Sequence, residues 1–311
     1  MIEVRELGRT FGETVAVDSL SFSVEKGELF GLVGPDGAGK TTTLRMLAGV
    51  LRPTSGDALL DGSSVARDPE AVKHHVAYMS QRFGLYEDLT VLENLHFYAD
   101  LYRVPRAERA PRLDRLFAFS GLEPFRDRLA GKLSGGMKQK LGISCALIHR
   151  PRILLLDEPT FGVDPVSRRE LWIIVHEMVA EGVTALVSTA YMDEAERFDR
   201  LVMLHRGRRL AVDTPEGLRR AETGDLLEIP VDRPRAAREV LAREAGVRHA
   251  VVFGDRIHVT VEHDGDAAAR LDATLRRAGL VPQPAIAIEP SMEDVFVRRI
   301  TEADAAREAA A

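Results

Sequence analysis

The chain has 311 residues, of which 45% are hydrophobic and 29% charged, a composition ordinary for globular proteins. This composition excludes a wholly disordered, collagenous or coiled-coil chain, and the length fits one large or two modest domains. Its 42 Lys and Arg against 48 Asp and Glu give a net charge of −6, so we expect no global attraction to nucleic acid. The single cysteine, Cys145, excludes a disulfide within the chain and fits a reducing, cytosolic compartment.

The hydrophobic runs are short. The first residues lack a basic segment followed by an apolar one, so we expect no signal peptide. No apolar run approaches the roughly 18 residues that a membrane-spanning helix needs. The chain is therefore not expected to cross a membrane.

Strand and helix patterns alternate through the first two thirds of the chain. Alternating or continuous apolar runs predict strands, and apolar residues at helical spacing predict helices. The expected elements are strands over 2–7, 14–24 and 29–33, a helix over 40–48, a mostly helical segment over 84–150, a strand over 152–156, a helix over 165–181, a strand over 183–189 and a hairpin over 201–212. This order predicts an α/β core with a mostly parallel sheet.

The last third has a different pattern. After Pro215, strands and helices are expected in the order βαββαβ, with a final helix over 291–300. This order is typical of a small ferredoxin-like domain. We therefore expect a first domain over 1–217 with a helical subdomain over 84–150, an accessory α+β domain over 225–301, and a frayed tail over 302–311.

A glycine-rich loop lies between the strand 29–33 and the helix 40–48. Its sequence from Gly34 to Thr41 fits G-x-x-x-x-G-K-[ST], the phosphate-binding P-loop. Glycines let successive backbone N–H groups point at phosphate oxygens, and the helix N-terminus adds partial positive charge. Lys40 would reach the β- and γ-phosphates, and the Thr41 hydroxyl would ligate Mg²⁺. The alternative, a chance glycine-rich turn, is disfavoured by the strand before it and the helix after it.

Two carboxylates follow the apolar strand that ends at Leu156. Asp157 and Glu158 would lie beside the P-loop, because the carboxyl ends of parallel strands meet at one edge of the sheet. Asp157 would hold the Mg²⁺ shell, and Glu158 would orient or deprotonate an attacking water. Alone, the pair could instead cap a turn before Pro159; with the P-loop upstream, the catalytic interpretation is favoured.

A third motif, LSGGMKQ, precedes a helix that runs to about Ile148. Ser134 is a good N-cap, and Gly135 and Gly136 leave the first N–H groups of the helix open to an anion. By itself this pattern is more typical of a plain capped helix. Its order and spacing relative to the two other motifs favour a phosphate contact.

Together, GPDGAGKTT, LSGGMKQ and ILLLDEPT over residues 1–220 resemble the nucleotide-binding subunits of ABC transporters. The resemblance implies an ATP-binding P-loop NTPase core with an antiparallel β subdomain and a helical subdomain. It implies nucleotide contacts at Phe11, at Gly34, Pro35, Asp36, Gly37, Ala38, Gly39, Lys40, Thr41 and Thr42, and at Ser134, Gly135, Gly136 and Asp164. ATP and Mg²⁺ are the implied ligands, with Thr41, Gln81 and Asp157 at the metal.

Three of these assignments have structural alternatives. Phe11 would stack on adenine, but it could be a strand-end core residue. Gln81 would link Mg²⁺ and the attacking water to a transmembrane partner, and so joins Lys40 and Glu158 as a catalytic candidate; it could also be an exposed loop glutamine. Asp164, in a loop that crosses the dimer interface of the family, could also cap the next helix.

The resemblance also implies an assembly. Two such domains face each other head to tail, and Ser134, Gly135 and Gly136 of one would cover the ATP of the other. An ABC permease would dock near Phe83–Leu92, although Phe83, Leu85 and Tyr86 could equally be core. The implied place is the cytoplasmic face of the membrane, peripherally bound, as a transport-coupled ATPase.

One position departs from the family. The segment STAYMDEA matches S-T-H-x-x-D-E-A, but Ala190 occupies the histidine position that contacts the γ-phosphate. Loss of such a donor can cost roughly 10²–10³ in rate. The chain could pair with a histidine-bearing ATPase, with a slow or regulatory role of its own, or form a slower homodimer.

The C-terminal extension gives a hint of subtype. Its SMEDVF element, Ser291–Phe296, is similar to drug and antibiotic exporters of the daunorubicin type. It could instead be an amphipathic helix covering core surface. A soluble ABC ATPase acting on DNA or ribosomes is the alternative function, but no second ATPase half or long coiled coil is present in the sequence.

Overall fold

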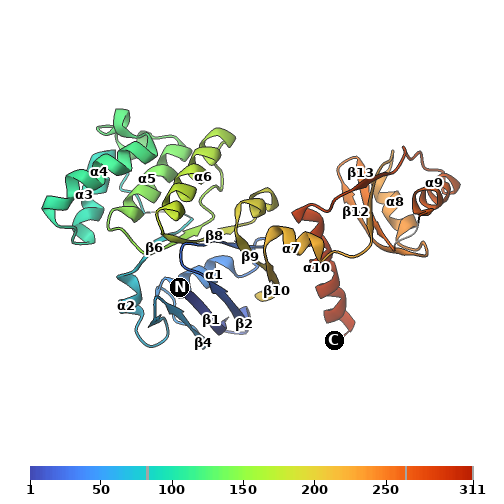
Figure 1. The fold of residues 1–311 in the computed structure, drawn as a ribbon, viewed down its shortest axis with the longest axis horizontal. Coiled ribbons are helices and arrows are strands. Elements are labelled where there is room, and N and C mark those ends of the chain that lie inside the picture. The colour runs from blue at the N-terminus through green and yellow to red at the C-terminus, as the bar shows by residue number, and fades with distance from the viewer. Residues whose placement is uncertain (82–83, 263–264, 310–311) are drawn as a thin grey trace. The chain divides into compact units, whose positions relative to one another are not determined.

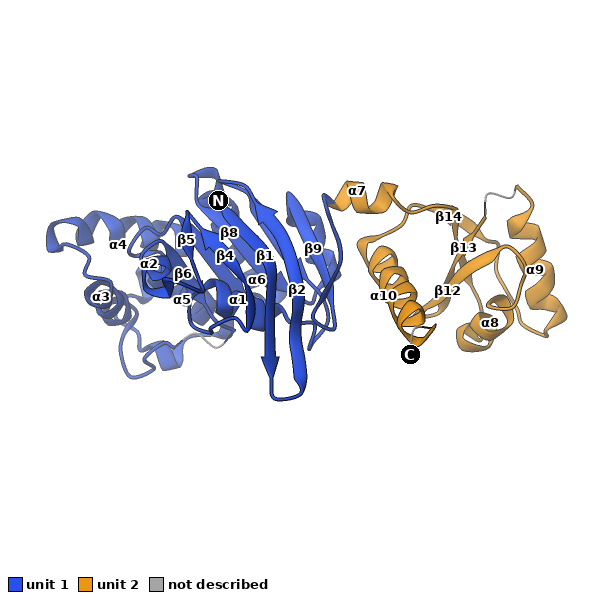
Figure 2. Ribbon diagram, turned by 90° about the horizontal axis from the view of Figure 1, so that it is seen from below, with its two compact units in different colours: residues 1–214 blue, residues 215–311 orange. Residues whose placement is uncertain are grey.

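The computed structural model describes residues 1–81, 84–262 and 265–309. Within these, the chain divides into two compact units, Met1–Thr214 and Pro215–Ala311 (Figure 2). The division falls directly after a β-hairpin and before a short helix.

The centre of the first unit is a six-stranded sheet with the order β10-β9-β3-β8-β7-β6 (Figure 1). All neighbours are parallel except the terminal hairpin of β9 and β10. The strands are β3 (Leu29–Val33), β6 (Val76–Met79), β7 (Ile153–Asp157), β8 (Thr184–Thr189), β9 (Arg200–His205) and β10 (Arg208–Asp213). Every residue of β3, β7 and β8 is buried, as the continuous apolar runs predict for central parallel strands.

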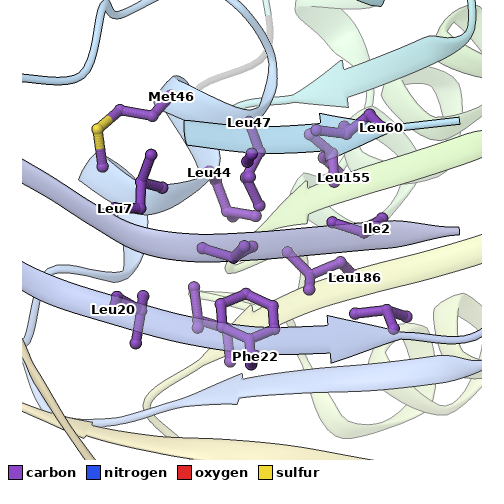
Figure 3. Close-up of a cluster of buried hydrophobic side chains, with 14 of the residues drawn as sticks. Ile2, Leu7, Leu20, Phe22, Leu44, Met46, Leu47, Leu60, Leu155 and Leu186 are labelled. Carbon is purple, nitrogen blue, oxygen red and sulfur yellow. The ribbon is translucent and has the colours of Figure 1, made fainter. Parts of the chain in front are cut away.

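An antiparallel sheet packs against this core. Its order is β2-β1-β4-β5, from β1 (Ile2–Phe11), β2 (Thr14–Val24), β4 (Ser55–Leu60) and β5 (Ser63–Ser64). Apolar side chains of β1 and β2 meet α1 (Lys40–Leu47) and residues of β7 and β8 in one cluster, shown in Figure 3. Burying each leucine here contributes about 1.5–3 kcal/mol relative to exposure. This core holds α1 in place, with its first residues beside the carboxyl ends of the central strands.

Helices form the middle of the unit, as expected for 84–150. They are α3 (Val91–Leu101), α4 (Arg106–Ser120), α5 (Gly135–Leu147) and the short turns η1 (Glu123–Phe125) and η2 (Ala130–Lys132). Thr90 and Glu93 form a reciprocal capping box that starts α3. The unit also contains α2 (Pro69–Lys73), α6 (Pro165–Ala180) and η3 (Met192–Arg197).

The second unit begins with α7 (Pro215–Arg220) and contains a four-stranded antiparallel sheet. Its order is β12-β13-β11-β14, from β11 (Asp225–Pro230), β12 (Val247–Phe253), β13 (Arg256–Val261) and β14 (Ile286–Ile288). With α8 (Pro234–Leu241) and α9 (Ala267–Arg277), the chain order is βαββαβ, and the strand order is that of a ferredoxin-like fold. Helices α8 and α9 cover one face through an apolar core (Figures 1 and 2).

The last helix, α10 (Met292–Ala309), differs from the expectation. The sequence pattern predicts a helix that ends at residue 300 and a frayed tail over 302–311, whereas the helix continues through Ala309. The physical reason is the alanine content of the tail, since alanine has the highest helix propensity. The pair Arg298–Glu302 adds an i,i+4 contact of 2.9 Å. No helix in the described part of the chain is long and apolar enough to span a membrane.

Candidate functional site

The loop between β3 and α1 is built around backbone rather than side chains. Gly37 and Gly39 have φ values of 77° and 101°, in the left-handed region that glycine tolerates. A Cβ at Gly34 would lie 2.5 Å from the carbonyl oxygen of Leu204, and one at Gly39 would lie 2.6 Å from that of Ala16. These approaches leave no room for larger residues. Packing therefore requires glycine at 34 and 39, whereas at Gly37, where a Cβ would meet no atom within 4 Å, the left-handed backbone favours it.

Lys40, the first residue of α1, is the buried cation of the site, with only 4% of its side chain exposed. Its Nζ donates to the carbonyl oxygens of Gly34 (2.7 Å) and Pro35 (3.0 Å), and lies 3.0 Å from Oε1 of Glu158. A buried charge needs such partners. The structure thus brings together the lysine of the P-loop motif and the glutamate of the second carboxylate motif.

Asp157, at the end of β7, is the centre of a hydroxyl cluster. Its Oδ1 accepts from Thr41 Oγ1 (3.0 Å) and Ser188 Oγ (2.8 Å), and its Oδ2 accepts from the Tyr78 hydroxyl (3.2 Å). These groups come from the start of α1 and from the ends of β8 and β6, which meet at one edge of the sheet. Burial and the charge of Asp157 raise the pKa of Tyr78 to about 12, so its hydroxyl keeps its proton near neutral pH.

Glu158 has an unusual backbone. Its φ is 49°, which is uncommon outside glycine and points to a functional constraint. The conformation is held by Ser188, whose Oγ accepts from the Glu158 N–H at 3.0 Å. On the other side, Gln81 Nε2 donates to Glu158 Oε2 at 3.3 Å. The carboxylate is thereby fixed between Lys40 and Gln81.

The residues fit a magnesium nucleotide. The glycine-rich backbone has no side chains to exclude a phosphate, and Lys40 supplies a cation beside it. Thr41, Asp157 and the Gln81 amide offer the hard oxygen donors that Mg²⁺ prefers. Among the described residues no three His, Cys, Asp or Glu side chains gather into a metal site of their own. Mg²⁺ usually takes one or two carboxylates and completes its shell with phosphate and water, which matches this set.

The remaining residues of the loop have peripheral positions. Pro35 is half-buried and Asp36 is exposed, whereas Ala38 is buried. Thr42 is half-buried in the first turn of α1. Their backbone positions, rather than their side chains, belong to the predicted phosphate cradle.

The LSGGMKQ segment lies at the start of α5. Ser134 caps the helix as predicted, accepting from the Met137 N–H at 3.3 Å. Gly136 packs against α6, because a Cβ there would lie 2.2 Å from Ser167 Oγ. In the described chain no hydrogen bond joins Ser134 to the loop 34–42 of the same molecule. The structure therefore does not bring this motif to the chain's own P-loop contacts.

Two further predicted contacts are placed at the surface. Phe11, at the end of β1, is 46% exposed, and the Arg9 guanidinium lies 4.5 Å from the centre of its ring. It is therefore not the core residue of the alternative interpretation. Asp164 caps α6 by accepting from the N–H groups of Val166 and Ser167, so its predicted capping role is confirmed.

The segment after β8, which contains Ala190, is held in place by contacts of the residues on either side of Ala190. The buried Glu194 accepts from Thr189 Oγ1 (2.6 Å) and from Trp172 Nε1 (3.1 Å). On the other side of Ala190, the Arg168 guanidinium lies 4.3 Å from the centre of the Tyr191 ring. The backbone at position 190 is thus fixed without a histidine.

Two members of the site, Tyr78 and Ser188, lie outside the residues that the motifs predict. Tyr78 lies on β6, a four-residue strand that was not predicted, and its contact with Asp157 has no signal in sequence spacing. Ser188 was quoted in the STAYMDEA segment but was not selected as a site residue. Its position opposite Asp157 in the β7–β8 register is the feature that could have indicated the contact.

These features define a P-loop nucleotide-binding protein. The profile of the ABC transporter family matches residues 17–161. The chain is 37% identical to the Nod factor export ATP-binding protein I of Burkholderia orbicola over 301 residues, covering 96% of each chain. It is 34% identical to the daunorubicin resistance ATP-binding protein DrrA2 of Streptomyces coeruleorubidus, covering 99% of this chain and 98% of that one. The chain belongs to the ATP-binding proteins of the ABC transporter family.

Other relatives differ in length. The chain is 42% identical over 285 residues to the probable multidrug ABC transporter ATP-binding protein YbhF of Escherichia coli, and spans 48% of its length. Among solved structures, an ATP-binding subunit of an ABC transporter matches with a TM-score of 0.65 and 34% identity, over 71% of this chain and 92% of that one. A dimeric bacterial ABC transporter cassette matches with a TM-score of 0.63 and 25% identity, over 69% and 98%.

Proposed function

We propose that the chain is the ATP-binding and ATP-hydrolysing subunit of an exporter that drives a separate membrane permease. The observation that carries the proposal is the meeting of Lys40, Asp157, Glu158 and Gln81 at one edge of the sheet. Lys40 lies 3.0 Å from Glu158, and Thr41 lies 3.0 Å from Asp157. The names of the relatives that match almost full length support the export role.

Each residue has a defined task in this proposal. The N–H groups of residues 34–41 and the Lys40 ammonium bind the phosphates of ATP and neutralise charge on the transferred group. Thr41, Asp157 and Gln81 would hold Mg²⁺, which would neutralise phosphate charge when bound. Glu158 accepts a hydrogen bond from the attacking water and takes its proton. The Ser188 contact keeps Glu158 aimed at the site during this step.

A head-to-tail dimer completes the site. Ser134, Gly135 and Gly136 have no hydrogen bond to the chain's own loop among the described residues, and a related cassette is known as a dimer. The open N–H groups at the start of α5 would face the γ-phosphate bound by a second ATPase domain. That second domain is either another copy or a related subunit, and Asp164 would lie in the loop at their interface.

The permease would dock on the segment 84–92; Phe83, which belongs to the expected Phe83–Leu92 segment, lies outside the described residues. The Asn94 side chain holds this segment, since its Oδ1 accepts from the Tyr86 N–H (2.9 Å) and its Nδ2 donates to the Tyr86 carbonyl (3.0 Å). The Tyr86 side chain itself is 44% exposed. A rigid loop with an exposed aromatic suits a protein contact at the cytoplasmic face of the membrane.

Ala190 favours one alternative. A methyl group cannot donate to a γ-phosphate, so the chain could be a slow or regulatory ATP-binding subunit paired with a histidine-bearing ATPase. A soluble ABC ATPase outside transport would share the site but would co-purify with nucleic acid or ribosomes instead of a membrane protein.

ATP-dependent dimerisation tests the proposed assembly. Light scattering of the full chain carrying Glu158→Gln should show the mass double on addition of ATP and Mg²⁺, because binding continues while hydrolysis is blocked. Lys40→Ala should stay monomeric under the same conditions. A Glu158→Gln chain that binds ATP and remains monomeric would contradict a homodimer and favour the paired-subunit alternative.

A further inference from the structure

In the second unit, β12 is an edge strand of the four-stranded sheet. It pairs with β13 on one side, and among the described residues no strand pairs with its other side. Residues Phe253 and Arg256 flank a two-residue turn, so they form the first hydrogen-bonded pair of the hairpin. The alternation from that pair turns the backbone N–H and C=O groups of Ala250 and Val252 outward.

A groove runs along this edge. Its volume is about 540 Å³, and its floor is the stretch 247–252 of β12. One wall is α8, through Arg238 and Ala242, and the other is α10, through Val297 and Thr301. Six consecutive strand residues between two helical walls make a channel that matches one extended chain of about 20 Å.

The charged side chains that line the groove indicate which kind of peptide it can bind. Its lining includes Arg238 and Arg248 and, among the described residues, no Asp or Glu. His249 also lines the groove, but it lies 3.5 Å from Glu302 of α10 and burial lowers its pKa, so the two arginines carry the positive charge. The Arg248 guanidinium lies at the end of the strand, where it donates to Thr223 Oγ1 at 2.8 Å and lies 3.8 Å from a carboxylate oxygen of Glu262. A second copy of this chain would bring its own Arg238 and Arg248 to the same two cations, and like charges that face each other destabilise a cross-strand pair.

We propose that the β12 edge binds an extended, acidic peptide segment of a partner protein as an added strand. The outward groups of Ala250 and Val252 supply main-chain hydrogen bonds, and Arg238 and Arg248 pair with carboxylates on alternate residues of the segment. This site is separate from the nucleotide site and does not depend on the function proposed above.

A synthetic peptide of alternating valine and glutamate, labelled with fluorescein, tests the proposal on the full chain. Fluorescence anisotropy should show binding at least tenfold tighter than for the matching valine–lysine peptide. The double variant Arg238→Glu/Arg248→Glu should reverse that preference. Arg235→Glu, an exposed arginine of α8 outside the groove, should leave it unchanged, and ATP binding should be unaffected in all variants.

Hydrogen exchange locates the peptide. The amides of Ala250 and Val252 should gain protection when the glutamate peptide binds, and Ala250→Pro should remove binding by deleting an outward N–H. Equal binding of both peptides, or no binding of either, would overturn the proposal even if Ala250→Pro fails to fold. Dimerisation of the chain that protects the same amides without peptide would assign the groove to a second copy and would also overturn it.

Discussion

At the scale of single residues, the positions of Asp157 and Glu158 depend on partners that neighbouring strands supply. Ser188 contacts both, accepting from the Glu158 N–H and donating to Asp157. Tyr78 adds a second hydroxyl to Asp157 from β6. The two carboxylates and the cation Lys40 were predictable because they lie in motifs. Their hydroxyl partners were not, because contacts between strands depend on register rather than on spacing along the chain.

Tyr78→Phe should weaken the hold on Asp157 without changing the shape of the core. Loss of one hydrogen bond to a charged group costs about 1.5–3 kcal/mol. We expect the Mg²⁺ concentration needed for half-maximal binding of a fluorescent ATP analogue to rise about tenfold or more. Binding of the analogue without Mg²⁺ serves as the control and should stay unchanged. An identical Mg²⁺ dependence in both proteins would show that the Tyr78 hydroxyl does not position Asp157.

Ala190→His should restore a donor toward the γ-phosphate. The backbone at position 190 is already fixed by the Glu194 contacts, so the new side chain would extend from a set position. We expect steady-state ATP turnover to rise by about 10²-fold if the missing histidine limits the rate. Tyr191→His, one residue along, is the matched control and should not raise turnover. An unchanged rate in Ala190→His would rule out this limit.

At the scale of elements, the contact of α5 with α6 depends on one glycine. A Cβ at Gly136 would lie 2.2 Å from Ser167 Oγ and 2.3 Å from Ser167 Cβ, whereas one at Gly135 has its nearest atom 3.9 Å away. Gly136→Ala should therefore force the helices apart and cost about 1–3 kcal/mol. Thermal unfolding should show Tm fall by several degrees for Gly136→Ala and little for Gly135→Ala. Equal Tm values in the two variants would contradict this packing.

The start of α10 is tied to the sheet of the second unit by His258. Its Nδ1 lies 2.6 Å from Asp294 and its Nε2 lies 3.2 Å from Glu228, while Phe253 stacks on the ring. Asp294 also forms a capping box with Ser291, and Arg256 contacts Glu228. The predicted SMEDVF element therefore includes both the helix start and a link to the sheet.

This link should make the stability of the second unit depend on pH. Burial disfavours the charged imidazole, but the contacts with Asp294 and Glu228 outweigh it and raise the pKa of His258 above 6.5. Burial also opposes the Asp294 charge, yet hydrogen bonds from His258 and Ser291 lower the pKa of that carboxyl below 3.8. The stabilisation from His258 is complete below pH 6.5 and is lost as pH rises through its raised pKa. That from Asp294 is complete above pH 3.8 and is lost as pH falls through its lowered pKa.

Hydrogen exchange of the α10 and β13 amides in the full chain measures this dependence. Protection relative to His258→Gln should be largest between about pH 4 and 6.5 and should shrink at higher pH, because the variant cannot become charged. A difference that is constant from pH 5 to 9 would show that the His258 charge does not hold α10.

At the scale of the whole molecule, the sequence predicted the alternation that builds the central sheet and the ferredoxin-like order of the last third. It did not predict β4, α2 or β6, because runs such as Val76–Met79 are too short for a period to appear. The extension of α10 was missed because an alanine-rich end resembles a frayed one. The absence of a hydrogen bond from Ser134 to the chain's own loop 34–42, among the described residues, agrees with the expectation from the family resemblance that this motif faces a second domain.

Phosphate binding and proton removal both belong to the hydrolysis of ATP. Lys40 and the loop glycines bind the phosphates, and Glu158 removes a proton from the attacking water. If Glu158 has this role, one substitution at that position should stop ATP hydrolysis and leave ATP binding intact. Glu158→Gln keeps the shape of the side chain and its distance from Gln81, but it has no carboxylate to accept the proton.

Steady-state ATP hydrolysis by the purified full chain with Mg²⁺, measured beside ATP binding, tests this assignment most directly. We expect clear turnover in the parent chain, a loss of at least 10²-fold in Glu158→Gln, and ATP binding that persists in the variant. Undiminished turnover in Glu158→Gln would contradict the role of Glu158, and failure of the parent chain to bind ATP would contradict the site itself.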